Sequence, residues 1–254
     1  MAEIPFSIIV PALISGLLIL LSHVPFGREV LKRGIIFIDL AVAQAAATGA
    51  LLATYFWHAE LSFAIEISAA LLAMLVAAFL HQLEHLCPKI QEPIIGCTFV
   101  VLASIAMLLL ASDPHGSEHY TNLLSGEILW SDSNTHISLA ATGAFALLAF
   151  TVFKHPLLRF YLPFAIAITA SVQAIGIYLV FATLILPAIA IRELQGFKAI
   201  VYGIGIGASA YIVGLLASVI FNLPSGPAIV IALALCVAIA AVAIHVKLKT
   251  PDLV

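Results

Sequence analysis

Two histidines and a glutamate stand at helical spacing in the stretch HQLEH, from His81 to His85. This sequence matches the HxxEH pattern of an inverted zinc-protease motif. Imidazole and carboxylate groups together are a common ligand set for zinc. The motif ends just before Pro88, and we find neither a third ligand nor a substrate cleft in the neighbouring sequence. The ordinary interpretation is a polar helix end. A membrane-embedded zinc enzyme that uses His81, Glu84 and His85 is kept as an alternative.

A second group of potential ligands lies between Ser112 and His136, a stretch with four acids and three histidines but neither Lys nor Arg. His115 and His119 flank Glu118 at a spacing of four, which on one helical turn would aim two imidazoles the same way. Imidazole and carboxylate suit zinc or another first-row divalent ion. We therefore expect a transient metal entrance at these three residues, with a solvated polar loop as the alternative because Gly116 disfavours a helix.

Asp39 and Gln44 lie inside the apolar stretch IIFIDLAVAQAAATGALLA. An ionised carboxylate within a membrane span costs several kcal/mol unless it is paired or hydrated, so Asp39 is a functional candidate. A carboxylate that reaches the membrane surface or pairs with Arg33 is the alternative. Gln44 and Thr48 provide either hydrogen-bonding groups or a face for close helix packing.

Several other chemistries are disfavoured. The net charge is −3 and the ten Lys and Arg are dispersed, so we do not expect nucleic acid as a partner. Cys87, Cys97 and Cys236 show no CxxC spacing and are interpreted as small buried hydrophobes. The sequence has no GxxxxGK[ST] phosphate loop, so energy for active transport must come from a partner or an ion gradient. No permanently bound cofactor is expected.

The whole chain has the composition of a membrane protein. Hydrophobic residues make up 63% of the 254 residues, charged residues only 9%, and the mean hydropathy is +1.20. A soluble domain has about a quarter of its residues charged, so lipid must surround this chain. We expect one transmembrane domain over residues 1–254.

Spanning helices need roughly 20 apolar residues. The stretch from Tyr161 to Ile191 would form a helix of roughly 46 Å, too long for one passage across about 30 Å and short for two. We expect it to turn back near Gln173 to Gly176. The other predicted spans are 5–22, 35–57, 62–80, 94–111, 137–153, 199–221 and 226–246.

This turn gives nine passages, of which the seventh, about Ile177 to Ile191, is short and interrupted by Pro187. Such a segment is tolerated only where protein or a water-filled cavity surrounds it. Cytoplasmic loops collect Lys and Arg, so we expect the N-terminus outside and the C-terminus in the cytoplasm. With nine passages, all ten basic residues face the cytoplasm: Arg28, Lys32, Arg33, Lys89, Lys154, Arg159, Arg192, Lys198, Lys247 and Lys249.

Four motifs together resemble the permease subunits of bacterial ABC transporters that import zinc, manganese or iron(II). The resemblance covers nearly the whole chain, in order. The motifs are VLKRGIIFIDLAVAQAAATGALLA at 30–53, LLSGEILW at 123–130, VQAIGIYLVFATLILPAIAIREL at 172–194 and FNLPSGPAIVIALA at 221–234.

The resemblance implies a fold of the cobalamin-permease type in the bacterial inner membrane, with two copies forming one central pathway. It also implies an extracytoplasmic metal-binding protein that delivers the ion and separate cytoplasmic ATPase subunits. In many members an Asp and a His on the second helix hold the metal. The Asp matches Asp39, whereas the nearest match to the His is Gln44, one residue further along.

The family places a coupling helix between the fifth and sixth passages, where this chain has only KHPLLRFY, from Lys154 to Tyr161. The resemblance implies ATPase contacts at Lys154, His155 and Arg159, shared or not with the loop from His81 to Pro93. Histidines in the outer loop favour zinc over manganese or iron(II) as the cargo. A secondary carrier that works without ATP is the remaining alternative.

Overall fold

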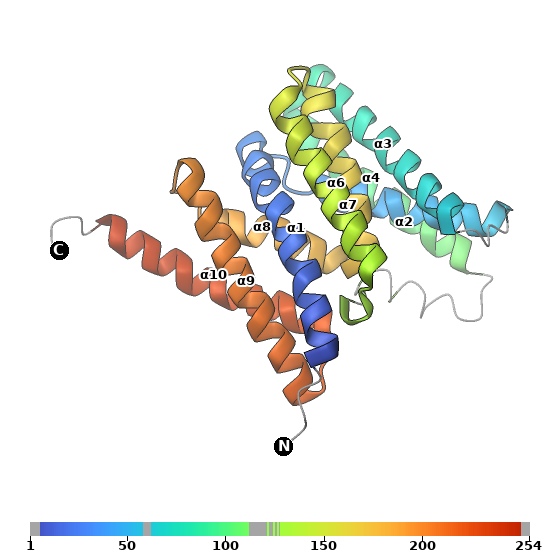
Figure 1. Ribbon diagram of the computed structural model, residues 1–254. Coiled ribbons are helices and arrows are strands. Elements are labelled where there is room, and N and C mark those ends of the chain that lie inside the picture. Colours follow the sequence, from blue (N-terminus) through green and yellow to red (C-terminus); the bar gives the residue numbers. More distant parts are fainter. Residues whose placement is uncertain are drawn as a thin grey trace.

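The computed structural model describes residues 6–57, 62–111, 121, 124, 126 and 128–249. These residues form helices joined by short connections (Figure 1). In chain order the elements are α1 (Phe6–Arg33), α2 (Ile38–Trp57), α3 (Ser62–Leu86), η1 (Pro88–Ile90), α4 (Gln91–Leu110), η2 (Ile128–Trp130), α6 (Ser133–Val152), η3 (Leu157–Tyr161), α7 (Leu162–Ile175), α8 (Ile177–Ala190), α9 (Gly196–Phe221) and α10 (Ser225–Lys249).

Eight helical segments of the described chain are long and apolar enough to cross a membrane: α1, α2, α3, η1 with α4, α6, η3 with α7, α9 and α10. The remaining apolar helix, α8, has only 14 residues. Eight long spans and one short seventh segment are the arrangement that the sequence predicts. The all-helical polytopic fold is therefore confirmed.

The first helix is longer than the sequence indicates. We expected it to end at residue 22, but α1 continues through Pro25 to Arg33. The continuation is stabilised by packing, since Phe26 is buried among the rings of α6, η3 and α7. The helix ends at Gly34, whose φ of 71° allows its own amide and that of Ile35 to bond back to α1 carbonyls.

The seventh passage turns back where the length mismatch predicts. Gly176 has a φ of 76°, which favours glycine, and it separates α7 from α8. Ten of the fourteen α8 residues are buried, including Thr183 and Pro187. Protein therefore surrounds this short segment, as its length requires.

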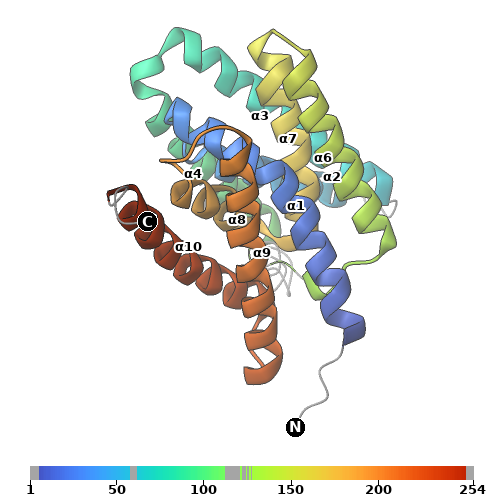
Figure 2. The same ribbon diagram turned by 60° about the vertical axis from the view of Figure 1, so that its left-hand side comes forward.

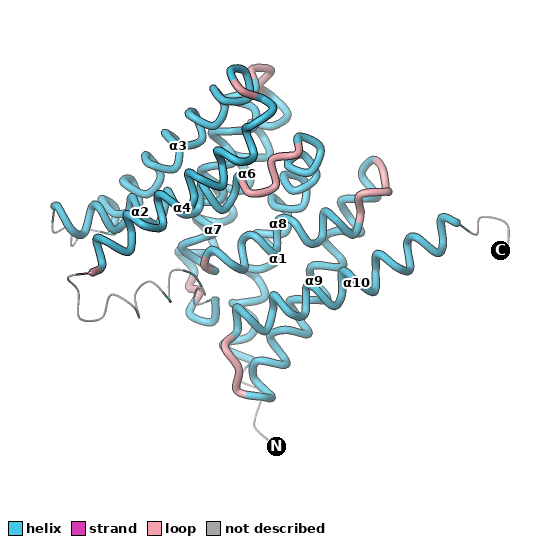
Figure 3. The backbone as a smooth tube through the Cα atoms, turned by 180° about the vertical axis from the view of Figure 1, so that it is seen from behind, coloured by secondary structure: helices cyan, strands magenta, loops and turns pink. Residues whose placement is uncertain are grey.

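The helices form two outer groups around a middle one. α2, α3 and α4 lie on one side of the molecule and α9 and α10 on the other, as Figures 1 and 3 show. Between them α8 packs against α1 and α10, and α1 also packs against α6 and α9 (Figure 2). Helix α2 contacts α3, α4, α7 and α8, which places most of its surface inside the subunit.

One end of the molecule collects the basic residues. Arg33 at the end of α1 bonds Glu84 near the end of α3, and Tyr161 of η3 bonds the same carboxylate. Arg28 donates to the carbonyl of Leu194 between α8 and α9. We call this the basic end, since these connections and their flanking helix turns carry Arg28, Lys32, Arg33, Lys89, Lys154, Arg159, Arg192 and Lys198.

The opposite end holds the α7–α8 turn, the start of α1 and the α9–α10 turn. Near its start α1 contacts α6, where His136 Nε2 lies 3.0 Å from the Pro11 carbonyl oxygen. The segment before α6 covers the α7–α8 turn: Ile128 is buried, and the backbone of Gly126 approaches Ile175 so closely that a side chain would collide with it. Gly126 and Ile128 of the LLSGEILW motif therefore contribute close packing at this end.

The approach of α1 to α8 provides a test of the packing. A Cβ at Gly27 would overlap the Leu184 carbonyl oxygen and lie 3.1 Å from the Ala188 Cβ. Overpacking of this kind costs about 1–3 kcal/mol. We expect Gly27→Ala to lower the thermal unfolding midpoint of the detergent-solubilised protein.

The matched control is Gly205→Ala in α9, where nothing lies within 4 Å of the added Cβ. This variant is expected to unfold at the wild-type temperature or above. If Gly27→Ala unfolds like Gly205→Ala, α1 does not approach α8 as closely as described.

Candidate functional site

Of the predicted metal ligands, the two on α2 lie in the interior of the subunit. The exposed fraction is 1% for Asp39 and 0% for Gln44. Small residues allow this burial, because α2 carries a run of alanines and Gly49 brings its backbone against α3. Thr48 fixes α2 against α4 by donating to the carbonyls of Gln44 and Leu102.

Neither residue is satisfied by the protein. Within the described residues, both carboxylate oxygens of Asp39 and both polar atoms of the Gln44 amide are buried without a hydrogen-bond partner. Buried polar groups are nearly always paired, and an unpaired carboxylate in a span costs several kcal/mol. These groups therefore need partners beyond the described residues, such as water or a cation.

The alternative pairing of Asp39 with Arg33 is not formed. The Arg33 guanidinium instead bonds Glu29 at 3.0 Å and Glu84 at 3.1 Å, and it lies 4.5 Å from the Phe160 ring centroid. The burial of Asp39 also rules out a carboxylate that reaches the membrane surface. Both ordinary explanations of this acid fail, which strengthens its assignment as a functional group.

Asp39 and Gln44 point in different directions. Five residues on a helix correspond to about 140° around its axis, so the two side chains lie on different faces of α2. The residue on the face of Asp39, four positions on, is Ala43. An ion would therefore meet Asp39 and Gln44 one after the other unless other elements supply ligands.

The structure brings to Asp39 a second carboxylate that the sequence analysis missed. Glu92 lies in the first turn of α4, and its Oε1 accepts from the Phe37 amide at 3.1 Å. Its Oε2 is buried without a partner in the described chain, and its charge is close enough to act on Asp39. An acid just inside a predicted span was the available signal.

A buried histidine on α1 was also missed. His23 is 1% exposed, its Nδ1 lies 3.1 Å from Ser22 Oγ, and its Nε2 has no partner among the described residues. Its position in an apolar span, SHVPF, was the available signal.

His81, Glu84 and His85 do come together at the basic end of α3. One potential ligand atom from each lies within 4.8 Å of the other two. This confirms that the three side chains share one face of the helix.

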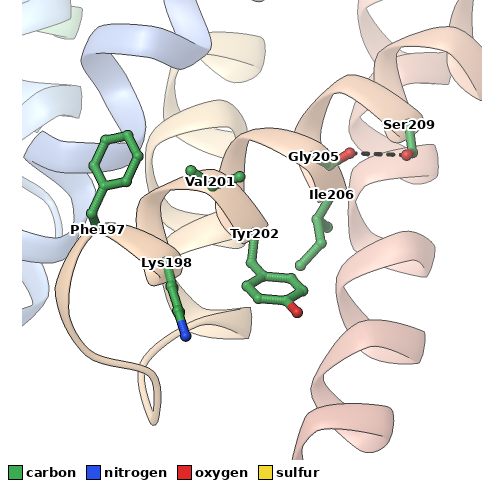
Figure 4. Close-up of a pocket in the computed structure, with 7 residues that line it drawn as sticks. All are labelled: Phe197, Lys198, Val201, Tyr202, Gly205, Ile206 and Ser209. Carbon is green, nitrogen blue, oxygen red and sulfur yellow. Dashed lines mark hydrogen bonds between the residues drawn. The ribbon is translucent and has the colours of Figure 1, made fainter.

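A hollow of about 670 Å³ lies elsewhere, along one side of α9 (Figure 4). It is lined mainly by Phe197, Val201, Tyr202 and Ile206, with Lys198 at one end. The residues that line it carry neither imidazole nor carboxylate. It is therefore not a metal site, and it is not next to the histidines of α3.

The residues expected to contact an ATPase are at the surface of the basic end. Lys154 and His155 are exposed in the connection that precedes η3. Arg159 is exposed too, but it donates to the Phe150 carbonyl at 3.1 Å and covers the Phe150 ring. The expected coupling helix is reduced to the five-residue turn η3, which continues directly into α7.

The predicted outer metal ligands His115, Glu118 and His119 lie outside the described residues. The acid that begins α6, Asp132, has a local role. Its Oδ1 accepts from the amide and the hydroxyl of Thr135 at 2.8 and 2.7 Å, and these hydrogen bonds hold the pKa of Asp132 below its usual value. Asp132 is therefore a helix cap.

The fold is similar to solved structures of transporters. A chain of PsaBC from Streptococcus pneumoniae in complex with Fab aligns with a TM-score of 0.71 and 21% identity, covering 93% of this chain and 91% of that chain. A transporter described as of the metal-chelate ABC type, in an inward-facing conformation, aligns with a TM-score of 0.60 and 15% identity, covering 96% and 86%. Among curated proteins, no significant sequence match is found.

The sequence itself matches the ABC 3 transport family over residues 5–163 and 158–244, which together span nearly the whole chain. Members of this family are permeases of metal-ion transporters whose ATP hydrolysis takes place in a separate subunit. That assignment removes the zinc-enzyme interpretation of the α3 histidines. The chain belongs to the ABC 3 transport family and is a multi-pass membrane permease of an ABC transporter for metal ions.

Proposed function

We propose that this permease imports a first-row divalent metal ion and that Asp39 binds the ion during its passage. The observation that supports this most is the buried Asp39 carboxylate, whose two oxygens have no partner in the described chain. A dication that has lost part of its water shell offers the missing charge and the missing ligand bonds at once.

Two neighbours extend the proposed path. Glu92 presents a second buried carboxylate oxygen near Asp39, and Gln44 presents an amide further along α2. An ion that binds first at a strong site with carboxylate ligands and then at a weaker amide site can move on, whereas an ion that is held too tightly is not released.

The choice of ion depends on which donors dominate. Oxygen donors at Asp39, Gln44 and Glu92 favour manganese(II), whereas the outer histidines His115 and His119 favour zinc. We keep zinc and manganese(II) as the two leading cargoes, with iron(II) third. Uptake of one radioactive ion in the presence of an excess of another would show which ion the transporter prefers.

Access to Asp39 requires movement. Because this side chain is buried within one subunit, it does not lie on a free face where a second copy could bind. We infer that the ion enters between two copies and reaches Asp39 only when ATP-driven rearrangement separates the helices that cover α2.

The orientation of the chain in the membrane follows from the charges. The basic end would face the cytoplasm of a bacterial cell by the positive-inside rule. The N-terminus and the acidic stretch with His115, Glu118 and His119 then face outward, where an extracytoplasmic metal-binding protein delivers the ion. The C-terminus is then cytoplasmic.

The surface around η3 suits the ATPase. Phe153 and Leu158 are each 43% exposed beside Lys154 and His155. Exposed apolar side chains such as this pair, with a polar rim beside them, are a surface that a protein partner can cover. Arg159 supports this surface from within by holding the Phe150 carbonyl.

The first test removes the charge of Asp39 and keeps its size. Asp39→Asn is expected to reduce uptake of radioactive manganese(II) or zinc by about tenfold or more, since a charged ligand contributes about 1.5–3 kcal/mol. Asp132→Asn is the control, because that acid caps α6 at the surface. Wild-type uptake by Asp39→Asn, at equal protein level in the membrane, would exclude Asp39 from the path.

A second test addresses the ATPase contact. Reversing the charge at Lys154 with Lys154→Glu should reduce co-purification of the ATPase subunit by about tenfold or more, because like charges then face one another. Lys198→Glu, an exposed cation at the start of α9, serves as the control. Equal recovery of ATPase with both variants would place the contact elsewhere.

A third test concerns the outer residues. His115→Ser combined with His119→Ser should raise the metal concentration needed for half-maximal uptake and leave the maximal rate unchanged, because these ligands only concentrate the ion. Uptake kinetics over a range of metal concentrations check this. A lower maximal rate with unchanged half-saturation would contradict the assignment.

A further inference from the structure

The α3 histidines remain unexplained by the transport path. His81, Glu84 and His85 place one donor atom each within 4.8 Å of the others. Donors bound to one zinc ion lie about 3–4 Å apart, because each is about 2 Å from the metal. His85 is exposed and can rotate, so a shift of about an ångström completes the set.

The geometry of the cluster is that of a ligand site with one open coordination position. His81 is 6% exposed, and its Nδ1 has no hydrogen-bond partner in the described chain, although it lies 3.6 Å from Glu84 Oε2. A buried imidazole nitrogen that faces a carboxylate beyond hydrogen-bond distance suits a cation between them.

Neighbouring side chains hold the carboxylate in position. The Tyr161 hydroxyl donates to Glu84 Oε2 at 3.0 Å, and the Gln91 amide donates to that hydroxyl at 3.3 Å. Hydrogen bonds of this kind orient metal ligands and are a regular part of metal sites.

The local charge is compatible with a cation. Arg33 bonds Glu84, but it also bonds Glu29 at 3.0 Å, so two carboxylates face one guanidinium. A carboxylate accepts up to about four hydrogen bonds, and Glu84 therefore keeps lone pairs for a metal ion.

A third imidazole comes from another element. The ring of His155, in the connection before η3, lies 5.8 Å from the ring of His81. His155 is exposed and can supply the fourth ligand of a tetrahedral site. Ligation by His155 would fix the end of α3 to the connection that leads into η3.

We propose that His81, Glu84 and His85, completed by His155 or water, bind a zinc-class dication at the basic end of α3, separately from the transport path. The site binds metal from the aqueous phase at that end. Its regulatory consequence rests on the proposed function: metal bound there restrains the segment that contacts the ATPase, so accumulated metal slows the transporter.

The binding test uses Co²⁺ as a probe of the detergent-purified protein, because imidazole-bound Co²⁺ in a tetrahedral site absorbs visible light. Wild type should show this absorption, and excess Zn²⁺ should remove it. The absorption should be lost in His81→Ala and in His85→Ala, and Tyr161→Phe should weaken binding by about tenfold or more.

Two controls separate this site from the path. Gln82→Ala changes an exposed neighbour on the same helix and should keep the signal. Asp39→Asn should also keep it. Loss of the signal in Asp39→Asn together with retention in His81→Ala would overturn the site, as would absence of the absorption in wild type.

The regulatory role is tested on the complex of the permease with its ATPase subunit. Zn²⁺ added on the ATPase side should slow ATP hydrolysis in wild type and in Gln82→Ala, but not in His85→Ala. Equal inhibition of His85→Ala and wild type would overturn the regulatory role. The Co²⁺ signal needs neither ATPase nor transport, so failure of the proposed import function would not be mistaken for failure of this site.

Discussion

A carboxylate without a partner is the constraint on which the interior of this permease depends. Asp39 is buried among helices, and no cation and no side-chain donor of the described chain bonds its oxygens. In a membrane span such a group is tolerated only if something from outside satisfies it. The packing of small residues along α2 therefore buries a carboxylate whose charge is not balanced within the described chain, and under the proposed function a passing dication balances it.

The contacts of Arg33 explain why Asp39 has no cationic partner within the described chain. It is the basic residue nearest in sequence to Asp39, yet it is held at the basic end by Glu29, Glu84 and the Phe160 ring. The same contacts join α1, α3 and η3. The Arg33 guanidinium thus holds the three elements together at the basic end and forms no ion pair with Asp39.

The sequence predicts those features that membrane thickness and charge distribution control. The α7–α8 turn at Gly176 follows from a stretch too long for one span, and the choice of Asp39 as a candidate follows from an acid among apolar residues. The extension of α1 through Pro25 does not follow, because aromatic packing by Phe26 decides it. Glu92 and the partners of Arg33 depend on contacts between helices far apart in sequence, which local patterns do not encode.

The brevity of α8 affects how its depth in the membrane is set. A helix of 14 residues is about 21 Å long, roughly two thirds of the hydrocarbon thickness. At its start a single residue, Gly176, separates α8 from α7, and protein covers this turn, where Ile175 and Ile177 are buried. The depth of α8 in the membrane is therefore set by the helices that pack on it, α1 and α10 above all, and not by lipid headgroups at both of its ends.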